Sequence, residues 1–221
     1  MSTRRPSPLG GAKPTRADLA RFTTDNPHAL DDVLPAPSQS ERSDPLRLLI
    51  VGVNPGLWTA SVNAPFARPG NRFWPALFRA GMTEYPIDAS RGLSPEDENH
   101  LLSRGIGITN LVGRATARAD ELGREELRRA GELLVERVCE LQPRVVAIAG
   151  ITAFRIAFGQ PKASLGKQHG SAISGWPEQV DLWVVPQPSG LNAHETIDSL
   201  AEKWRAIFDP EADGQRRHRD G

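Results

Sequence analysis

Two turns that lie far apart in the chain carry the side chains best suited to chemistry. The first runs from Gly52 to Gly56 and offers the amide group of Asn54. An asparagine amide can orient a water molecule or bind the edge of a base by hydrogen bonds, but it cannot act as a strong general base. The glycines let a ligand approach the backbone closely, and Pro55 keeps Asn54 out of helical geometry. Because these residues also form good turns, a purely structural role stays open.

The second turn, residues 187–192, presents an apolar side chain among small and polar residues. Leu191 belongs to no periodic apolar run, and apolar side chains that enter a duplex in place of an extruded nucleotide have this character. Ser189 and Asn192 could bind a phosphate group at the start of the helix that follows. The alternative is a hydrophobic staple, in which Leu191 packs on that helix.

Two further side chains could face the same crevice. Phe66 lies in a loop rich in proline and glycine, where an aromatic ring could form a stacking platform for a base. Asn110 lies near the end of a strand-like run, although it could equally cap a turn. Asn71 is placed to cap the helix that begins after it. A pocket beside an apolar wedge is what an enzyme needs to act on a base drawn out of DNA.

Alternating strand and helix patterns position these turns. Apolar runs rich in β-branched residues predict strands, and apolar positions at helical spacing predict helices. The expected strands are Leu46–Val53, Gly105–Val112, Val145–Ala149 and Leu182–Val185, and the expected helices are Asn71–Ala80, Glu121–Leu141, Thr152–Phe158 and His194–Phe208. This alternation predicts an α/β fold, a three-layer α/β/α sandwich with a central, mostly parallel sheet. The two turns would then meet at the carboxyl ends of the strands, where ligands bind.

The composition is typical of one domain with two tails. The 221 residues predict a folded domain over residues 46–208, a largely disordered N-terminal arm over 1–45 and a flexible C-terminal tail over 209–221. Within the arm, local order could form around Asp18–Leu34. The 27 basic and 27 acidic side chains balance, which argues against a strong grip on DNA by net charge alone. No apolar stretch approaches the roughly 20 residues of a membrane span. We therefore expect a cytoplasmic protein, associated with the nucleoid if it is bacterial.

Several other chemistries lack the residue patterns that they need. The single cysteine, Cys139, excludes an intramolecular disulfide and multi-cysteine metal sites, and its place in a leucine-rich helical pattern predicts burial. The five histidines show no metal-ligand spacing, and the sequence has neither a Gly-rich phosphate loop nor a Gly-x-Ser-x-Gly elbow. We expect no metal and no cofactor.

Five stretches in order resemble the mismatch-specific uracil-DNA glycosylases, the family that includes thymine-DNA glycosylase. They lie at residues 52–57, 65–74, 109–112, 166–168 and 188–191, and the similarity runs from about Leu46 to Phe208. The resemblance implies a uracil-DNA glycosylase fold and an enzyme that flips uracil out of a mismatch with guanine. Such an enzyme hydrolyses the N-glycosidic bond and leaves an abasic site. Since no lysine nucleophile is evident at the pocket, lyase activity is not expected.

The resemblance also implies roles for the residues of the first turn and of the intervening loops. Asn54 would position the water that attacks C1′ of the sugar, and Asn110 would be a second ligand of this water. Phe66 would stack on the flipped base. Backbone groups at Val53 and Gly56 would bind the edge of uracil. With only asparagine to orient the water, we expect slow turnover and faster release of uracil than of thymine.

The second turn carries the wedge that the resemblance implies. Leu191 would fill the gap left in the duplex, while Ser189, Gly190 and Asn192 would contact the unpaired guanine or the phosphates. The expected partner is double-stranded DNA that contains a G:U or related mismatch, and the expected state is a monomer. A mismatched base costs less to extrude, which favours G:U pairs.

The chain departs from the family pattern at three places. Gln187 stands where the bacterial motif often has asparagine, and Asn192 with Ala193 replaces a polar and basic pair, which alters the contacts expected to guanine and to the strand. An asparagine at position 110 is similar to the pattern of the branch that excises thymine, so the bases to be tested include thymine. Two other functions stay open: a non-catalytic module that binds nucleic acid or nucleotides on the same fold, and a hydrolase of free nucleotides, for which Leu191 would have no use.

Overall fold

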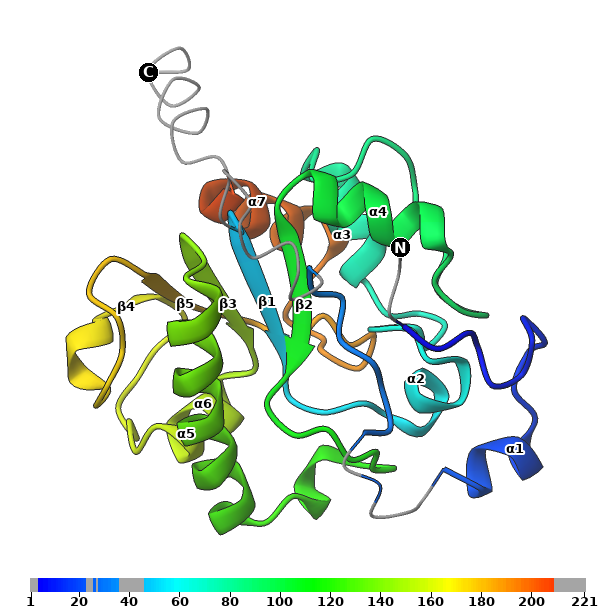
Figure 1. The fold of residues 1–221 in the computed structure, drawn as a ribbon, viewed down its shortest axis with the longest axis horizontal. Helices are drawn as coiled ribbons and strands as arrows, with labels where there is room; N and C mark the ends of the chain where they lie inside the picture. Colours follow the sequence, from blue (N-terminus) through cyan, green and yellow to red (C-terminus); the bar gives the residue numbers. More distant parts are fainter. Residues whose placement is uncertain (1–3, 23–25, 27, 36–45, 209–221) are drawn as a thin grey trace.

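The computed structural model describes residues 4–22, 26, 28–35 and 46–208, which fold around one sheet (Figure 1). The sheet has five strands in the order β2-β1-β3-β5-β4. Four strands are parallel, and the last pairs antiparallel with β5. The strands are β1 (Leu48–Gly52), β2 (Ile106–Asn110), β3 (Val145–Ala149), β4 (Gly166–Gln168) and β5 (Asp181–Val185). The predicted α/β fold with a mostly parallel sheet is confirmed.

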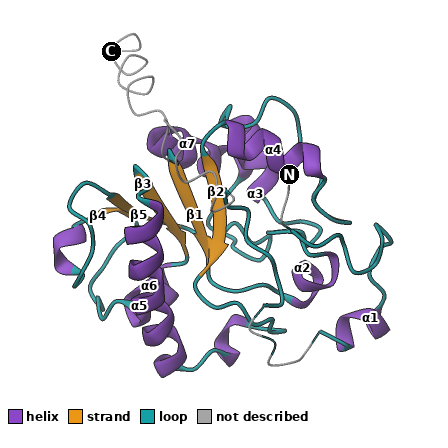
Figure 2. Ribbon diagram, in the orientation of Figure 1, coloured by secondary structure: helices purple, strands orange, loops and turns teal. Residues whose placement is uncertain are grey.

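Helices cover both faces of this sheet (Figure 2). Along β1, Leu48 and Ile50 face one apolar core, and Leu49 and Val51 face the other, because successive side chains of a strand point to opposite faces. The first core is completed by α3 (Phe73–Arg79), α4 (Pro95–Ser103) and α7 (Ile197–Phe208), and the second by α5 (Arg124–Leu141) and α6 (Ile151–Ala157). The result is three layers.

The register of the strands brings their carboxyl ends to one edge of the sheet. Gly52 at the end of β1 pairs with Asn110 at the end of β2, and Ala149 at the end of β3 pairs with Val185 at the end of β5. The loops that follow these strands therefore lie together, as expected for a parallel sheet.

All predicted strands and helices are present, with ends shifted by no more than three residues. The largest shifts, of three residues, are at α5, which begins at Arg124 and not at Glu121, and at α7, which begins at Ile197 and not at His194. Thr196 and Ser199 cap this helix reciprocally, because each hydroxyl accepts a hydrogen bond from the backbone N–H of the other residue, at 3.0 and 2.9 Å. The cap fixes where the helix starts.

The prediction that Cys139 is buried is wrong, because its side chain is exposed. The apolar face of α5 is formed by residues such as Leu134 and Val138, which are buried. One residue further along the helix turns the side chain by about 100°, away from that face. Cys139 therefore lies beside the buried stripe and not within it.

The described part of the N-terminal arm packs against the domain, and it includes residues 4–17, which precede the stretch where local order was expected. A short helix, α1 (Arg16–Ala20), lies next to α2 (Leu57–Val62). Val33 is completely buried and exchanges two backbone hydrogen bonds of 2.8 Å with Ile108 of β2. The predicted C-terminal tail, residues 209–221, lies outside the described residues.

Candidate active site

Asn54 follows β1 directly, and its amide group is held in one orientation. Its Nδ2 donates hydrogen bonds to the carbonyl oxygens of Pro55 and Arg114, both at 3.2 Å, and to Oγ1 of Thr116 at 2.7 Å. A flipped amide would place Oδ1 against two carbonyl oxygens, so the network fixes which atom faces them. No described residue donates a hydrogen bond to Oδ1. This oxygen is therefore available as an acceptor.

The loop that holds Asn54 is itself fixed by the start of α5. The guanidinium of Arg114 donates to both carboxylate oxygens of Glu126, from Nε at 2.6 Å and from Nη2 at 2.9 Å. These hydrogen bonds lower the pKa of Glu126, so its carboxylate stays ionised. A two-pronged pair of this kind restricts both side chains. The carbonyl of Arg114 is thereby held where Asn54 binds it.

Phe66 and Asn110 come together at Gly52. A Cβ atom on Gly52 would lie 2.3 Å from Oδ1 of Asn110 and 3.4 Å from Cζ of Phe66. One side of the half-buried Phe66 ring stacks on Phe73, with ring centroids 3.9 Å apart and planes inclined by 24°. Phe66 has a φ of 54°, a left-handed conformation that is costly for a bulky residue and that often occurs at functional sites.

Val53 and Gly56 flank Asn54 in the same turn. Val53 is buried, and its carbonyl oxygen accepts a hydrogen bond of 2.9 Å from the N–H of Val112. Gly56 is exposed and lies at the start of α2. Both lie close to Asn54 in the chain, and the carbonyl of Val53 is already bonded.

Leu191 is exposed over 82% of its surface, more than any other large apolar side chain among the described residues. Such exposure leaves little of the side chain to pack on a helix, and α7 begins only at Ile197. A hydrophobic staple needs the apolar contact that this side chain lacks. The staple alternative for Leu191 is therefore wrong.

Arg72 holds the loop that carries Leu191, although it was not among the site residues predicted from the sequence. Its guanidinium donates hydrogen bonds to three carbonyl oxygens of the loop, those of Ser189 at 3.4 Å, Gly190 at 3.3 Å and Asn192 at 2.8 Å. The only signal in the sequence was the position of Arg72 within the stretch 65–74. The planar guanidinium suits such multiple contacts.

The polar side chains of the second turn point back into their own loop. Oγ of Ser189 accepts a hydrogen bond from the N–H of Leu191 at 3.3 Å, and Nδ2 of Asn192 donates to the carbonyl of Gln187 at 3.1 Å. The start of α7 lies beyond both residues, so they are not at a helix N-terminus as expected. Their contacts stabilise the shape of the turn.

The first and second turns meet at Gly150, which follows β3. A Cβ atom on Gly150 would lie 2.8 Å from Cγ2 of Val53 and 3.3 Å from Nε2 of Gln187. Gly150 has a φ of 145°, which a residue with a side chain rarely adopts. The ends of three parallel strands thus bring the two turns together, as the sequence predicted.

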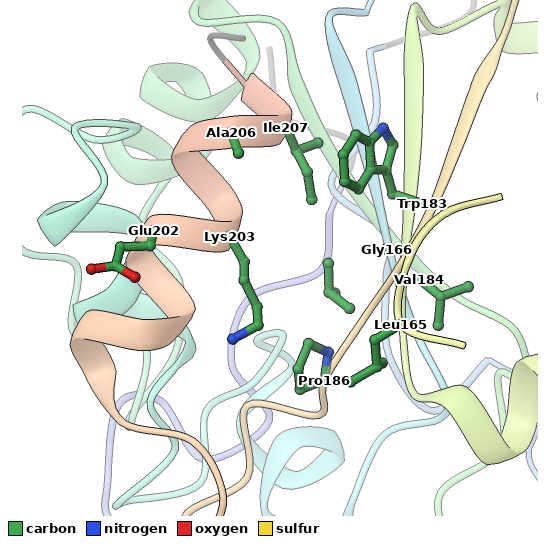
Figure 3. A pocket seen from close by; sticks show the side chains of 10 residues that line it. Leu165, Gly166, Trp183, Val184, Pro186, Glu202, Lys203, Ala206 and Ile207 are labelled. Carbon is green, nitrogen blue, oxygen red and sulfur yellow. The ribbon is translucent and has the colours of Figure 1, made fainter. Parts of the chain in front are cut away.

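A cavity of about 330 Å³ lies away from these residues, between α7 and the strands β4 and β5 (Figure 3). Leu165, Trp183 and Ile207 give it an apolar lining. Lys203 also borders it, but its ammonium group is paired with Glu195 at 2.9 Å. None of the predicted site residues lines this cavity, so we place the candidate active site at the strand ends.

Two kinds of site find no support in the described part of the chain. No group of three or more His, Cys, Asp or Glu side chains there could hold a metal ion. Likewise, none of the helices seen in these ranges has the length and apolar character needed to cross a membrane.

The comparison with protein families agrees with the fold and the two turns. A model of the uracil DNA glycosylase superfamily matches residues 40–209, well over half of the chain. The match covers all five strands, the helices α2 to α7, and both turns with Asn54 and Leu191. The described residues of the N-terminal arm precede it. The chain belongs to the uracil DNA glycosylase superfamily, whose members bind DNA and act as glycosylases in DNA repair.

Proposed function

We propose that this protein is a monofunctional, mismatch-specific uracil-DNA glycosylase that removes uracil from G:U pairs and leaves an abasic site. The observation that carries this proposal is the orientation of Asn54. Three hydrogen bonds hold its Nδ2, and Oδ1 is left as an acceptor just beyond the carboxyl end of β1. An acceptor in this position suits a water molecule that is to be aimed at a sugar carbon.

The reaction needs a fixed water more than it needs a strong base. As the bond between C1′ and the base breaks, positive charge develops on the sugar and negative charge on the base. Water then adds to C1′, and its proton ends on the departing base or in solvent. Oδ1 of Asn54 accepts one hydrogen bond from this water and directs its lone pair at C1′. Since an amide cannot take the proton, departure of the base runs ahead of attack, and a good leaving group matters.

In this proposal the flipped base lies next to Phe66, close to Asn54 and Asn110. The ring of Phe66 stacks on it with the face that does not contact Phe73. Backbone groups at Val53 and Gly56 bind the edge of uracil, and the amide of Asn110 acts as the second ligand of the water. The convergence of Phe66 and Asn110 at Gly52 supports this arrangement.

The second turn fills the duplex once the base has left it. Burying an exposed leucine side chain contributes about 2 kcal/mol of hydrophobic free energy, and Leu191 would gain this when it enters the base stack. The three hydrogen bonds from Arg72 keep the loop in shape, so little ordering is required on binding. Ser189, Gly190 and Asn192 contact the unpaired guanine or nearby phosphates. The enzyme acts as a monomer on double-stranded DNA.

Release of uracil from a duplex tests the proposal. A duplex with one G:U pair is incubated with the protein and then with alkali, and free uracil is measured in parallel. We expect cleavage at the uracil position, and we expect Asn54→Ala to lower excision about 10²-fold or more with unchanged DNA affinity. Asn99→Ala, at an exposed position on α4, is the matched control.

Other outcomes separate the remaining functions. Binding without release of uracil would indicate the non-catalytic module, and release from free deoxyuridine nucleotides would indicate the nucleotide hydrolase. Excision rates on G:U, A:U, G:T and single-stranded uracil define the substrate. We expect G:U to be the fastest, and an equal rate on A:U would contradict mismatch specificity.

A further inference from the structure

The described N-terminal arm contacts the two segments that carry Phe66 and Asn110. These arm residues, 4–5 and 28–33, precede the range that matches the superfamily. Their contacts join charged side chains and backbone groups of the arm to residues of the domain. The arm is therefore a feature of this chain that the family match does not cover.

The first contact is at Asn63, which ends α2 and begins the loop to Phe66. Asn63 is almost fully buried and has a φ of 49°. Its Oδ1 accepts a hydrogen bond from the N–H of Asp31 at 2.9 Å. Its Nδ2 donates to the carbonyl of Arg5 at 2.7 Å and to Oδ2 of Asp31 at 2.9 Å. The arm thus binds both polar ends of this amide.

Two arginines of the arm form further hydrogen bonds around Asn63. Nη2 of Arg4 donates to the carbonyl of Asn63, and its buried side chain lies 3.9 Å from the carboxylate of Glu98. Arg5 donates from its backbone N–H and its guanidinium to both carboxylate oxygens of Asp31, at 2.7 to 3.1 Å. Paired hydrogen bonds of this kind fix geometry as well as charge.

The loop that these contacts anchor is short and conformationally demanding. It leaves α2 at Asn63 and reaches Phe66 three residues later, and both residues have left-handed backbone conformations. Such conformations persist only where the surroundings enforce them. Phe73 supports the ring of Phe66 from one side, while the arm supports the start of the loop.

The second contact is on β2, next to Asn110. Oγ1 of Thr109 donates to Oδ1 of Asp32 at 2.8 Å, and Arg137 pairs with the same carboxylate at 3.0 Å. Val33 bonds to Ile108 through two backbone hydrogen bonds of 2.8 Å. The neighbouring residue of Asn110 is therefore held by the arm as well.

We propose that residues 4–5 and 31–33 of the arm are positioning residues that set Phe66 and Asn110 for uracil excision. The adjacent residues Asp31 and Asp32 each reach one of these two segments, which meet at Gly52. The proposal rests on the proposed glycosylase function. The arm acts through the protein and touches no substrate.

Asn63→Gly tests the first contact. Glycine accepts the left-handed backbone, so the change removes the three side-chain hydrogen bonds to the arm without adding strain. We expect the single-turnover rate on a G:U duplex to fall about tenfold, with a change in DNA affinity of less than about twofold. Arg5→Ala, whose side chain is 57% exposed, breaks the same cluster in case Asn63→Gly does not fold. Arg128→Ala removes an exposed ion pair on α5 and is its matched control.

A double substitution separates positioning from a general loss of structure. In a Phe66→Ala background, Asn63→Gly should have little further effect on the rate, because the ring that it positions is gone. An equal loss in both backgrounds, or an unchanged rate for Asn63→Gly and Arg5→Ala, would overturn the proposal. If the unaltered protein releases no uracil, the proposed function fails instead, so the two failures are distinguishable.

Discussion

Replacing Gly52 with alanine probes the point where Asn110 and Phe66 meet. The added methyl group would lie 2.3 Å from Oδ1 of Asn110 and 3.4 Å from Cζ of Phe66. The first distance is a clash, whereas the second is ordinary van der Waals contact. Gly52 does not have a left-handed backbone, so alanine introduces no strain of its own. The effect should therefore fall on the amide of Asn110.

The size of the effect follows from these distances. The Asn110 oxygen must retreat by about 1 Å to restore a contact of 3.4 Å. A displacement of about 1 Å in a group that orients reactants can lower a rate about 10²-fold. We expect the single-turnover rate on G:U duplex to fall by roughly this factor, with a loss of only a few degrees in melting temperature.

The assay is a double-mutant cycle measured with enzyme in excess over a labelled G:U duplex. Asn110→Ala removes the clashing oxygen, so Gly52→Ala should add little in that background. Asn99→Ala, at an exposed position on α4, is again the control.

Two results would refute this reasoning. A wild-type rate for Gly52→Ala would mean that the position of Asn110 does not matter for excision. The same loss with and without the Asn110 amide would mean that the effect arises elsewhere, for instance in the pairing of β1 with β2.

Three further predictions concern the wedge loop and the arm. Leu191→Ala should lower excision from duplex about tenfold and leave both the melting temperature and excision from single strands unchanged; equal losses on both substrates would exclude a wedge. Arg72→Lys should lower the melting temperature by a few degrees and slow excision from duplex, because lysine cannot reproduce the forked contacts to three carbonyl oxygens; an unchanged melting curve would contradict this. Burial alone would raise the pKa of Asp31, but hydrogen bonds from Arg5 and Asn63 outweigh it and lower the pKa to about 2. Because the folded-state pKa is depressed, the carboxylate stabilises the fold above pH 4 by about 1 kcal/mol after screening by water, and this stabilisation is lost as the pH falls towards 2. In Asp31→Asn the free energy of unfolding should therefore fall less between pH 4 and pH 2 than in the unaltered protein. Identical acid unfolding curves for the two proteins would contradict the assignment.

The sheet and its main helices could be predicted because their signals are local. β1, β3 and β5 are apolar runs, and α5 and α7 repeat apolar residues at helical spacing. β4 has three residues and α2 has six, which is too short for a period to appear. In α4 the residues buried are Glu98 and Leu101, so its face is only partly apolar, although Ser94 and Asp97 form a capping box.

The candidate site likewise contains residues that could be predicted from local sequence and residues whose roles depend on distant partners. Asn54, Phe66 and Leu191 stand out because an amide, an aromatic ring and an apolar side chain lie in loops rich in glycine and proline, and Asn110 stands out as an amide at the end of a strand. Arg72 does not stand out, since its role depends on carbonyl oxygens more than a hundred residues away. The orientation of the Asn54 amide depends likewise on partners about sixty residues away.

The contacts of the arm could not be predicted for a different reason. Its contacts are ion pairs and hydrogen bonds made by residues such as Arg5, Asp31 and Asp32, and such residues leave no periodic pattern. Polar composition is typical of disorder when the partners are unknown. Only the folded domain supplies the buried partners that order these residues.

The contact of Val33 with β2 also bears on whether copies of the protein associate through the edge of the sheet. β2 lies at one end of the sheet, and β4, at the other end, is only three residues long. An open strand edge is a template on which another chain can add a strand, and proteins that leave one exposed aggregate. The bridge between Val33 and Ile108 occupies the N–H and the carbonyl of Ile108, at the middle of this edge. A chain shortened to begin at residue 36 would uncover that edge, and we expect it to be less soluble than the full chain.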